Sequence, residues 1–231
     1  MRGEADIAAA ATLLAEPTRA ALVLAVIDDG PLPASELAAR ARIAPSTASQ
    51  HLTQLVSGGF LDASKNGRHR YYRLADEAVA EAVEALAVVA PQPAPRSLRE
   101  ATRGELLREA RTCYDHLAGR LGVALARSLE QRRIVQRRNG TYLVGPRAGR
   151  RLAELGIDLS RLELERRPVV RGCRDWSERE LHVAGGIGAA LATRLFELGW
   201  IERREANRSV AVTEPGRELL RTQLDVDLER H

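Results

Sequence analysis

This chain of 231 residues lacks several features that would place it in a familiar class of protein. Two cysteines are too few for a disulfide framework, and aromatic residues make up only 3% of the sequence, which favours packed helices over a β-sandwich or barrel. No apolar run reaches the roughly 20 residues that cross a bilayer. The N-terminus also lacks the basic and apolar segments of a secretory signal. We therefore expect a cytoplasmic protein with no membrane partner.

Familiar catalytic motifs are missing as well. The sequence contains no glycine-rich phosphate loop, no G-x-S-x-G nucleophile motif and no H-E-x-x-H zinc motif. Cys113 and His116 offer a nucleophile and a base, but their three-residue spacing on one helix gives poor geometry for that chemistry. The sequence therefore predicts no enzyme.

The composition and one proline-rich segment suggest two domains. Apolar residues make up 45% of the chain, so a buried core is expected. Residues 91–96 (PQPAPR) are the clearest linker. We predict one domain over residues 1–90 and a second domain over residues 97–231. The predicted fold class is mainly α with small β-hairpin wings (α+β).

Residues 33–74 carry the most informative pattern. A short amphipathic helix, a turn, a second helix and two strands around a glycine turn follow one another. Pro45 suits the first turn of the second helix, and Ala48, Leu52 and Leu55 form its apolar stripe. This order is typical of a winged helix-turn-helix, which places one helix in the DNA major groove. Further helices are predicted over residues 6–15, from Pro17 to 28, over 36–40 with Ser35 as the cap, and over 76–89.

The polar face of the second helix and the basic hairpin after it are the predicted DNA-binding surface. Glutamine can bond adenine bidentately, serine and threonine reach bases or phosphates, and basic residues beside a glycine turn suit phosphates. Residues 40–73 hold six basic groups and one acidic group, although residues 1–90 carry 8 Lys/Arg against 11 Asp/Glu. The candidate DNA-binding residues are Pro45, Ser46, Thr47, Ser49, Gln50, Thr53, Lys65, Arg68, His69 and Arg70. A winged-helix adaptor for protein contacts, without sequence-specific DNA binding, is the alternative.

Three segments together resemble an ArsR/SmtB-type repressor. They are Glu16-Pro17-Thr18-Arg19, the run from Ser46 to Leu52 (STASQHL), and the wing from Lys65 to Leu74. The resemblance covers about residues 6–90. It implies a homodimer with its interface at the N-terminal and post-wing helices. It also implies binding to a palindromic operator on double-stranded DNA and release by an effector.

The sequence departs from this family at the positions that usually sense metals. The helix before the recognition helix, residues 35–41, contains no cysteine. The post-wing helix has Asp76, Glu77, Glu81 and Glu84 but no histidine. Neither usual metal site is carried over, so an effector of unknown identity is expected to act on the extra C-terminal residues.

The C-terminal part contains an internal repeat, at about residues 113–155 and 179–222. His116 to Ala126 matches His182 to Ala192 at an offset of 66 residues. Each copy is predicted to form a helix, a strand, a turn, a strand and another helix, which resembles the second half of a winged helix. The glycines of each copy are expected to let two helices approach closely.

Both cysteines lie near the histidines of the repeat. The three-residue spacing is expected to place Cys113 and His116 on one helix face, and a pseudo-two-fold would bring Cys173 and His182 beside them. Cys113, His116, Cys173 and His182 would then form a Cys2His2 set that suits zinc or another borderline metal ion.

Other roles for this region remain open. The cysteines and histidines could be structural, or Cys113 and Cys173 a redox pair. Asp115 and Asp175 are candidate outer-shell partners of a metal. A small organic ligand between the repeats would use Tyr114, Asp175 and Trp176. Residues 175–180 are also expected to begin a helix with Ser177 as its cap.

Overall fold

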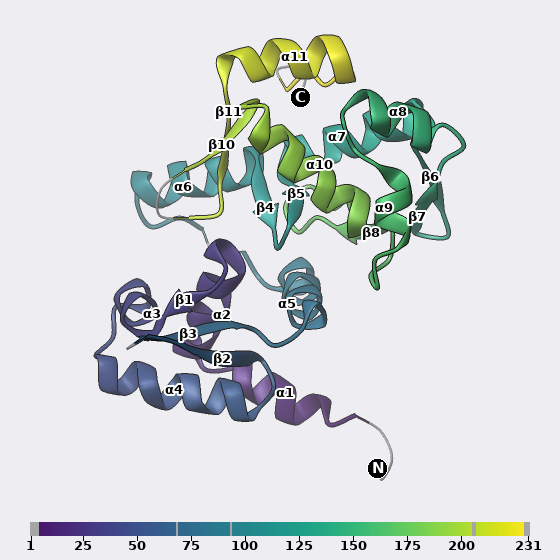
Figure 1. The fold of residues 1–231 in the computed structure, drawn as a ribbon. Coiled ribbons are helices and arrows are strands. Elements are labelled where there is room, and N and C mark those ends of the chain that lie inside the picture. Colours follow the sequence, from purple (N-terminus) through teal and green to yellow (C-terminus); the bar gives the residue numbers. More distant parts are fainter. Residues whose placement is uncertain (1–4, 68, 93, 205–206, 229–231) are drawn as a thin grey trace. The chain divides into compact units, whose positions relative to one another are not determined.

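The computed structural model describes residues 5–67, 69–92, 94–204 and 207–228, and the chain divides into two compact units (Figure 1). These units are Met1–Val83 and Glu84–His231. Both contain helices and short antiparallel strands, which confirms the predicted α+β class. The division falls within helix α5 (Glu77–Val89). The functional division into a domain over residues 1–90, a linker over 91–96 and a domain over 97–231 stays a prediction.

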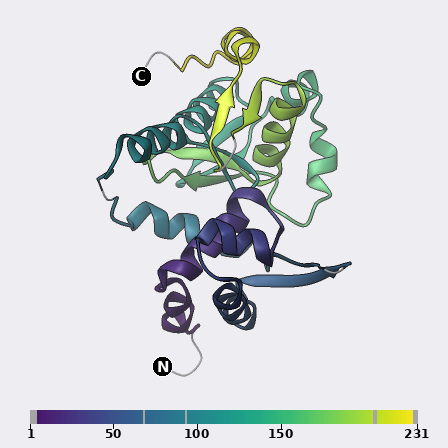
Figure 2. The ribbon, with the colours of Figure 1, turned by 90° about the vertical axis from the view of Figure 1, so that its left-hand side faces the viewer.

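The first unit has the element order of a winged helix-turn-helix. Its helices are α1 (Ile7–Leu14), α2 (Pro17–Asp29), α3 (Ala34–Ala41), α4 (Pro45–Ser57) and the beginning of α5. Its strands β1 (Leu32–Pro33), β3 (His69–Leu74) and β2 (Leu61–Asn66) form an antiparallel sheet in that spatial order. Figure 2 shows the β2–β3 hairpin projecting beyond the helices of this unit.

Apolar residues at helical spacing explain how these helices pack. Leu22 of α2, Leu37 of α3 and Leu52 of α4 are fully buried. Pro17 opens α2, where the carboxylate of Glu16 accepts a hydrogen bond from the Arg19 N–H at 2.8 Å. None of the described helices is by itself long and apolar enough to span a membrane; α1 and α2, bent by 88°, pass that test only as a pair, by length and composition.

Two local predictions for the first unit were wrong. Ser35 does not cap α3, because that helix begins at Ala34, two residues earlier than predicted, with Pro33 as an N-cap that makes no side-chain hydrogen bond. From the sequence, Phe60-Leu61 and residues 71–74 are the predicted strands of the wing. In the structure both strands extend further towards the turn, since β2 reaches Asn66 and β3 begins at His69.

The second unit opens with α6 (Leu98–Glu109) and then contains two runs of elements in the same order. Each run has a hairpin, a helix, a second hairpin and a second helix. The first consists of β4 (Arg111–Cys113), β5 (His116–Ala118), α7 (Gly119–Gln131), β6 (Val135–Arg138), β7 (Thr141–Val144) and α8 (Ala148–Glu154). After α9 (Leu159–Glu163), the second consists of β8 (Arg171–Arg174), β9 (Leu181–Ala184), α10 (Gly185–Glu197), β10 (Ile201–Arg203), β11 (Val210–Val212) and α11 (Glu214–Leu224).

The central helix of each run packs against the first hairpin of the other run. Helix α7 contacts β9, and α10 contacts β5. On the side of the other run, a Cβ on Gly122 would lie 3.6 Å from the His182 Cβ, and one on Gly188 would lie 3.2 Å from the His116 Cβ. The closest contacts are with the hairpin of the same run: these Cβ atoms would lie 2.4 Å from the carbonyl oxygens of Leu117 and Val183. At Gly122 and Gly188 the glycine thus makes room for hairpin backbone and not, as was predicted, for another helix. Gly119 does allow a close approach between helices, because its Cβ would lie 2.6 Å from the Arg108 carbonyl oxygen of α6.

Two further predictions for this unit need correction. Cys113 and His116 do not share a helix face; they face each other across the β4–β5 hairpin. Residues 175–180 do not begin a helix but form the turn between β8 and β9. There the Asp175 carboxylate accepts hydrogen bonds from the backbone N–H groups of Ser177 and Glu178, which stabilises the turn.

Candidate DNA-binding surface and candidate metal centre

Helix α4 has one buried and one polar face. Ala48, Leu52 and Leu55 are fully buried. Of the six candidate residues on this helix, Thr47 is half-buried and the others are exposed, namely Pro45, Ser46, Ser49, Gln50 and Thr53. The N-cap is Ala44, so no capping side chain competes with a phosphate for the first N–H groups. The helix therefore presents hydrogen-bonding groups in the arrangement expected of a recognition helix.

Arg19 connects α4 with α1 and α2, a role that was not predicted from the sequence. Its guanidinium donates to Gln54 Oε1 at 2.7 Å and to the carbonyl oxygens of Leu13 and Thr12 at 2.7 and 2.9 Å. One side chain thus links α1, α2 and α4. The only sequence signal for it is its place after Glu16-Pro17-Thr18.

The wing hairpin carries exposed basic residues near its tip. Lys65 on β2 lies directly opposite Arg70 on β3, and both are exposed, as is His69. The Arg70 guanidinium carbon lies 5.5 Å from the centre of the Tyr72 ring, which orients it by a cation–π contact. Arg68, also a candidate DNA-binding residue, is outside the described residues.

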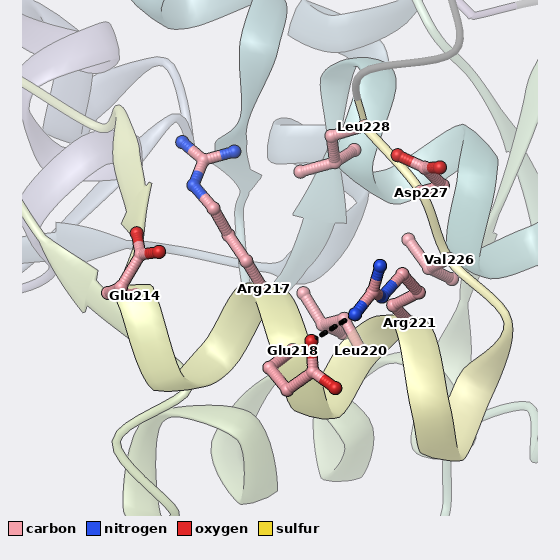
Figure 3. Close-up of a pocket in the computed structure, with 8 residues that line it drawn as sticks. All are labelled: Glu214, Arg217, Glu218, Leu220, Arg221, Val226, Asp227 and Leu228. Carbon is pink, nitrogen blue, oxygen red and sulfur yellow. Dashed lines mark hydrogen bonds and ion pairs between the residues drawn. The ribbon is translucent and has the colours of Figure 1, made fainter.

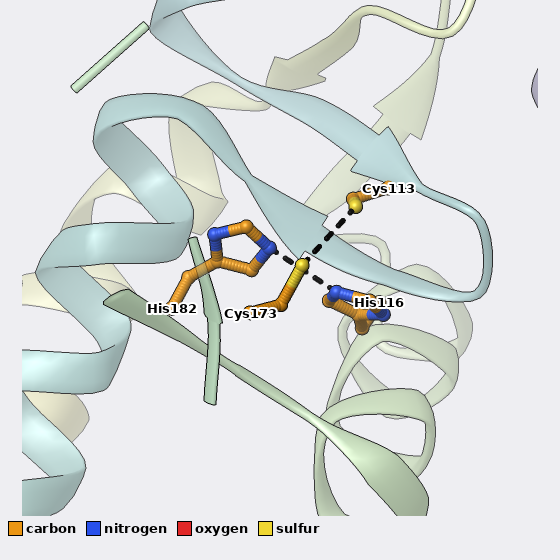
Figure 4. A group of neighbouring side chains, drawn as sticks. All are labelled: Cys113, His116, Cys173 and His182. Carbon is orange, nitrogen blue, oxygen red and sulfur yellow. Dashed lines mark hydrogen bonds between the residues drawn. The ribbon is translucent and has the colours of Figure 1, made fainter. Parts of the chain in front are cut away.

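The second unit brings together the four residues predicted as metal ligands (Figure 4). Cys113 pairs with His116 across β4–β5, and Cys173 pairs with His182 across β8–β9. One donor atom from each residue lies within 4.8 Å of the other three. The two Sγ atoms are 3.9 Å apart and the two Nε2 atoms 3.1 Å apart. Only Cys173 is half-buried; the other three are buried.

Each histidine of this cluster has a carboxylate on its outer side. His116 Nδ1 is 3.2 Å from Asp115 Oδ1, and the other carboxylate oxygen of Asp115 accepts a hydrogen bond from Arg167 at 2.5 Å. His182 Nδ1 is 3.6 Å from Asp175 Oδ2, slightly beyond hydrogen-bonding distance. Asp115 and Asp175 therefore lie where outer-shell partners of metal-binding histidines are found.

A buried ion pair supports the second of these carboxylates. Arg111 Nη2 donates to Asp175 Oδ1 at 2.8 Å, both side chains are 0% exposed, and the Arg111 guanidinium carbon lies 4.4 Å from the centre of the Trp176 ring. The Gly119 N–H donates to Asp175 Oδ2 at 2.6 Å. Burial would raise the pKa of Asp175, but the charge of Arg111 holds that pKa well below its usual range. The sequence reasoning missed Arg111.

Hydrogen bonds and charges within the cluster set its protonation. The hydrogen bond with Cys113, together with both histidines, holds the pKa of the Cys173 thiol well below its usual value despite burial. The same hydrogen bond, and burial, raise the pKa of the Cys113 thiol. Burial opposes the charged form of His116, but Asp115 and Cys173 raise its pKa overall. The lowered pKa favours the thiolate form of Cys173, which is the form of cysteine that binds metals.

A surface pocket lies elsewhere in the second unit, along α11 and the segment after it (Figure 3). Its lining is mostly charged, and Arg221 is paired with Glu218. None of the residues predicted for an organic ligand, Tyr114, Asp175 and Trp176, lines this pocket. That ligand site stays a prediction.

The comparisons with known proteins agree with this geometry. A family model described as a helix-turn-helix domain matches residues 14–62. The chain is 39% identical over 223 residues to the HTH-type transcriptional regulator YdfF of Bacillus subtilis (strain 168), covering 96% of this chain and 99% of that protein.

The solved structures match a smaller part of this chain than the curated relative does. The transcriptional repressor BigR from Xylella fastidiosa is 27% identical over 38% of this chain and 89% of its own, with a TM-score of 0.35. The homodimeric winged helix-turn-helix DNA-binding domain of Mb0332 from Mycobacterium bovis is 29% identical over 38% of this chain and 89% of its own, with a TM-score of 0.34.

The fold and the exposed polar helix define a winged helix-turn-helix DNA-binding protein. With a relative that it matches over almost its whole length, the chain belongs to the family of HTH-type transcriptional regulators, which agrees with the regulator class that the resemblance implied.

Proposed function

We propose that this regulator is a cytoplasmic homodimeric repressor that binds a palindromic operator and is released when its C-terminal domain senses an effector. The observation that carries the proposal is the exposed polar face of α4, followed in the same compact unit by a wing with exposed basic residues. Such a helix reads bases while the wing contacts phosphates. Dimerisation would double this small basic surface on a domain that is acidic overall.

Uncovered apolar helices support the homodimer. Helix α1 (IAAAATLL) has no buried residue, and its Ile7 is 77% exposed. Near the end of α5, Leu86 and Val89 are 50% and 77% exposed. Helices this apolar gain stability when a second copy covers them. These are also the helices that the family resemblance assigns to the interface.

Replacing Ile7 by glutamate should therefore weaken the dimer. Burying one isoleucine contributes about 1.5–3 kcal/mol, and a two-fold interface contains it twice. We expect the dimer dissociation constant to rise at least about tenfold, measured by sedimentation of the full chain. Leu164→Glu is the control, since Leu164 is 86% exposed in the second unit. Equal dimerisation by both variants would argue against α1 as the interface.

A continuous helix and a buried ion pair support effector sensing in the C-terminal domain. We interpret the two runs of that domain as winged-helix-like repeats, as their matching element order suggests. Glu84 on α5 is paired with Arg208, whose carbonyl oxygen accepts a hydrogen bond from the Thr112 N–H of β4 at 2.9 Å. A change at the β4–β5 hairpin would thus reach α5, which continues into the DNA-binding unit.

Operator binding by two variants tests the proposal. Gln50→Ala should weaken the free energy of operator binding by about 1–3 kcal/mol per half-site and alter the base preference at one position. Arg70→Ala should weaken binding to all sequences and lower the salt slope by about 1 for each phosphate that is no longer neutralised. Fluorescence anisotropy with operator and bulk DNA at several salt concentrations measures both effects. Arg150→Ala, which removes an exposed arginine of the second unit, is the control.

The protein-adaptor alternative gives a different result in the same titration. An adaptor would show no preference for one palindrome over bulk DNA. Unchanged affinity in both Gln50→Ala and Arg70→Ala, with the preference retained, would remove α4 and the wing from the proposed DNA interface.

A further inference from the structure

We propose that Cys113, His116, Cys173 and His182 bind one divalent cation of the zinc class in a tetrahedral site between the β4–β5 and β8–β9 hairpins. The site does not depend on the proposed repressor function. It would exist equally in a protein that binds no DNA.

The distance between the two sulfurs and the distance between the two nitrogens fit such a site, and all four donor atoms lie within 4.8 Å of one another. Zinc binds cysteine sulfur at about 2.3 Å and histidine nitrogen at about 2.0–2.1 Å, which in a tetrahedron separates two sulfurs by about 3.8 Å and two nitrogens by about 3.4 Å. The corresponding distances here are 3.9 Å between the Sγ atoms and 3.1 Å between the Nε2 atoms. A disulfide would require about 2.05 Å between the sulfurs.

The orientation of the histidines points to the same conclusion. His116 turns Nδ1 towards Asp115, and His182 turns Nδ1 towards Asp175, so that both Nε2 atoms face each other. If each Nδ1–H is directed at its carboxylate, both Nε2 atoms present lone pairs across 3.1 Å. A cation between them would bind both lone pairs.

The charge of the surroundings selects a divalent ion. Asp115 is paired with Arg167 and Asp175 with Arg111, so each outer carboxylate is already neutralised. A bound metal ion displaces the thiol protons, so both cysteines would bind it as thiolates, and a cation of charge two balances their charge. With an ion of any other charge, the net charge of the thiolates and the ion would not be zero, and an uncompensated charge is costly in a protein interior. Mixed sulfur and imidazole donors favour zinc over magnesium or calcium.

The burial of the four donors indicates a closed site. His116, His182 and Cys113 are 2%, 1% and 1% exposed, which leaves no position for a substrate. Cys173 is the half-buried member and gives the ion a route of entry. Because each hairpin supplies one cysteine and one histidine, the ion would join the two runs of the second unit.

Metal analysis of the full-length protein tests the proposal. Elemental mass spectrometry of protein kept reduced should find one zinc per chain. Replacement by Co²⁺ should give the intense visible bands of tetrahedral cobalt and a thiolate-to-cobalt charge-transfer band. The proposal is overturned if the protein retains no metal after loading with excess Zn²⁺ and gel filtration and shows no tetrahedral cobalt spectrum. A mass lower by two hydrogens with no free thiols in that reduced protein, indicating a Cys113–Cys173 disulfide, would also overturn it.

Two variants separate a ligand from its positioning partner. Cys173→Ser should remove the charge-transfer band and weaken Zn²⁺ binding by more than the roughly 10–100-fold that loss of an outer-shell partner costs. Asp115→Asn should weaken binding by about 10–100-fold with the tetrahedral cobalt spectrum retained. His69→Gln, on the wing, should leave both unchanged. Wild-type affinity in a folded Cys173→Ser variant would overturn the assignment, and if that variant fails to fold, wild-type affinity in Asp115→Asn would do so.

Discussion

Replacing Asp175 by asparagine is expected to lower the free energy of unfolding of the second unit by about 3–5 kcal/mol, the cost of leaving a buried charge unpaired. Asparagine is nearly the same size as aspartate but carries no charge to balance Arg111, which is 0% exposed. Urea denaturation followed by tryptophan fluorescence measures this directly. Both tryptophans of the chain, Trp176 and Trp200, lie in the second unit, so their fluorescence reports its unfolding.

An exposed ion pair at the same turn provides the control. Glu180 lies 3.6 Å from Arg137, and the two side chains are 45% and 49% exposed. Glu180→Gln should therefore cost less than about 1 kcal/mol. Measurements with excess Zn²⁺ and with a chelator separate loss of the ion pair from loss of a metal. If Asp175→Asn lowers the free energy of unfolding no more than Glu180→Gln does, both with Zn²⁺ and with the chelator, the buried ion pair is not structurally important.

A methyl group on Gly188 or Gly122 is expected to destabilise the second unit by about 1–3 kcal/mol or more. Either Cβ would lie only 2.4 Å from a backbone carbonyl oxygen, and the one on Gly188 would also lie 3.2 Å from the His116 Cβ. The backbone of a paired hairpin cannot move aside easily, so helix and hairpin must separate. Fluorescence-detected urea denaturation measures the loss for each variant.

Gly104 is a matched control for these substitutions. It lies within α6, and no atom comes within 4 Å of the place its Cβ would occupy. Gly104→Ala should stabilise the helix by about 0.5–1 kcal/mol, because alanine loses less conformational freedom on folding. Equal stability of Gly188→Ala and Gly104→Ala would contradict the close approach of α10 to the β8–β9 hairpin.

The first unit was largely predictable because its signals are local. Pro45 marks the start of α4, and the spacing of Ala48, Leu52 and Leu55 defines its buried face. The tight turn after Asn66 indicates where the two strands of the wing meet. The pairing of Pro33 with Tyr71 in the small sheet was not predicted, because a two-residue strand has no periodicity to detect.

The assembly of the four cysteines and histidines was predicted from the repeat, but their local structure was not. A spacing of three residues fits one face of a helix and equally fits the two ends of a two-residue hairpin loop. Tyr114, with φ of 60°, is in the left-handed conformation of such a loop, yet tyrosine gives none of the usual turn signals. The sequence therefore indicated which residues meet without indicating the element that carries them.

Contacts between distant charges could not be predicted at all. Arg111 and Asp175 are 64 residues apart, and Arg208 and Glu84 are 124 apart. The chain has 35 basic residues, nearly all of them arginine, so no local feature distinguishes the few that are buried. Only the packed structure identifies Arg111 and Arg208 as partners of buried carboxylates.

The most direct test of the central claim is selection of genomic DNA fragments by the full-length protein at physiological salt, followed by footprinting. A sequence-specific dimer predicts one enriched palindrome with two half-sites about 10–10.5 base pairs, or a multiple of this spacing, apart. Gln50→Ala should change the base selected at one position of each half-site. Uniform recovery of all fragments, or none above background, would contradict the assignment of α4 as a recognition helix.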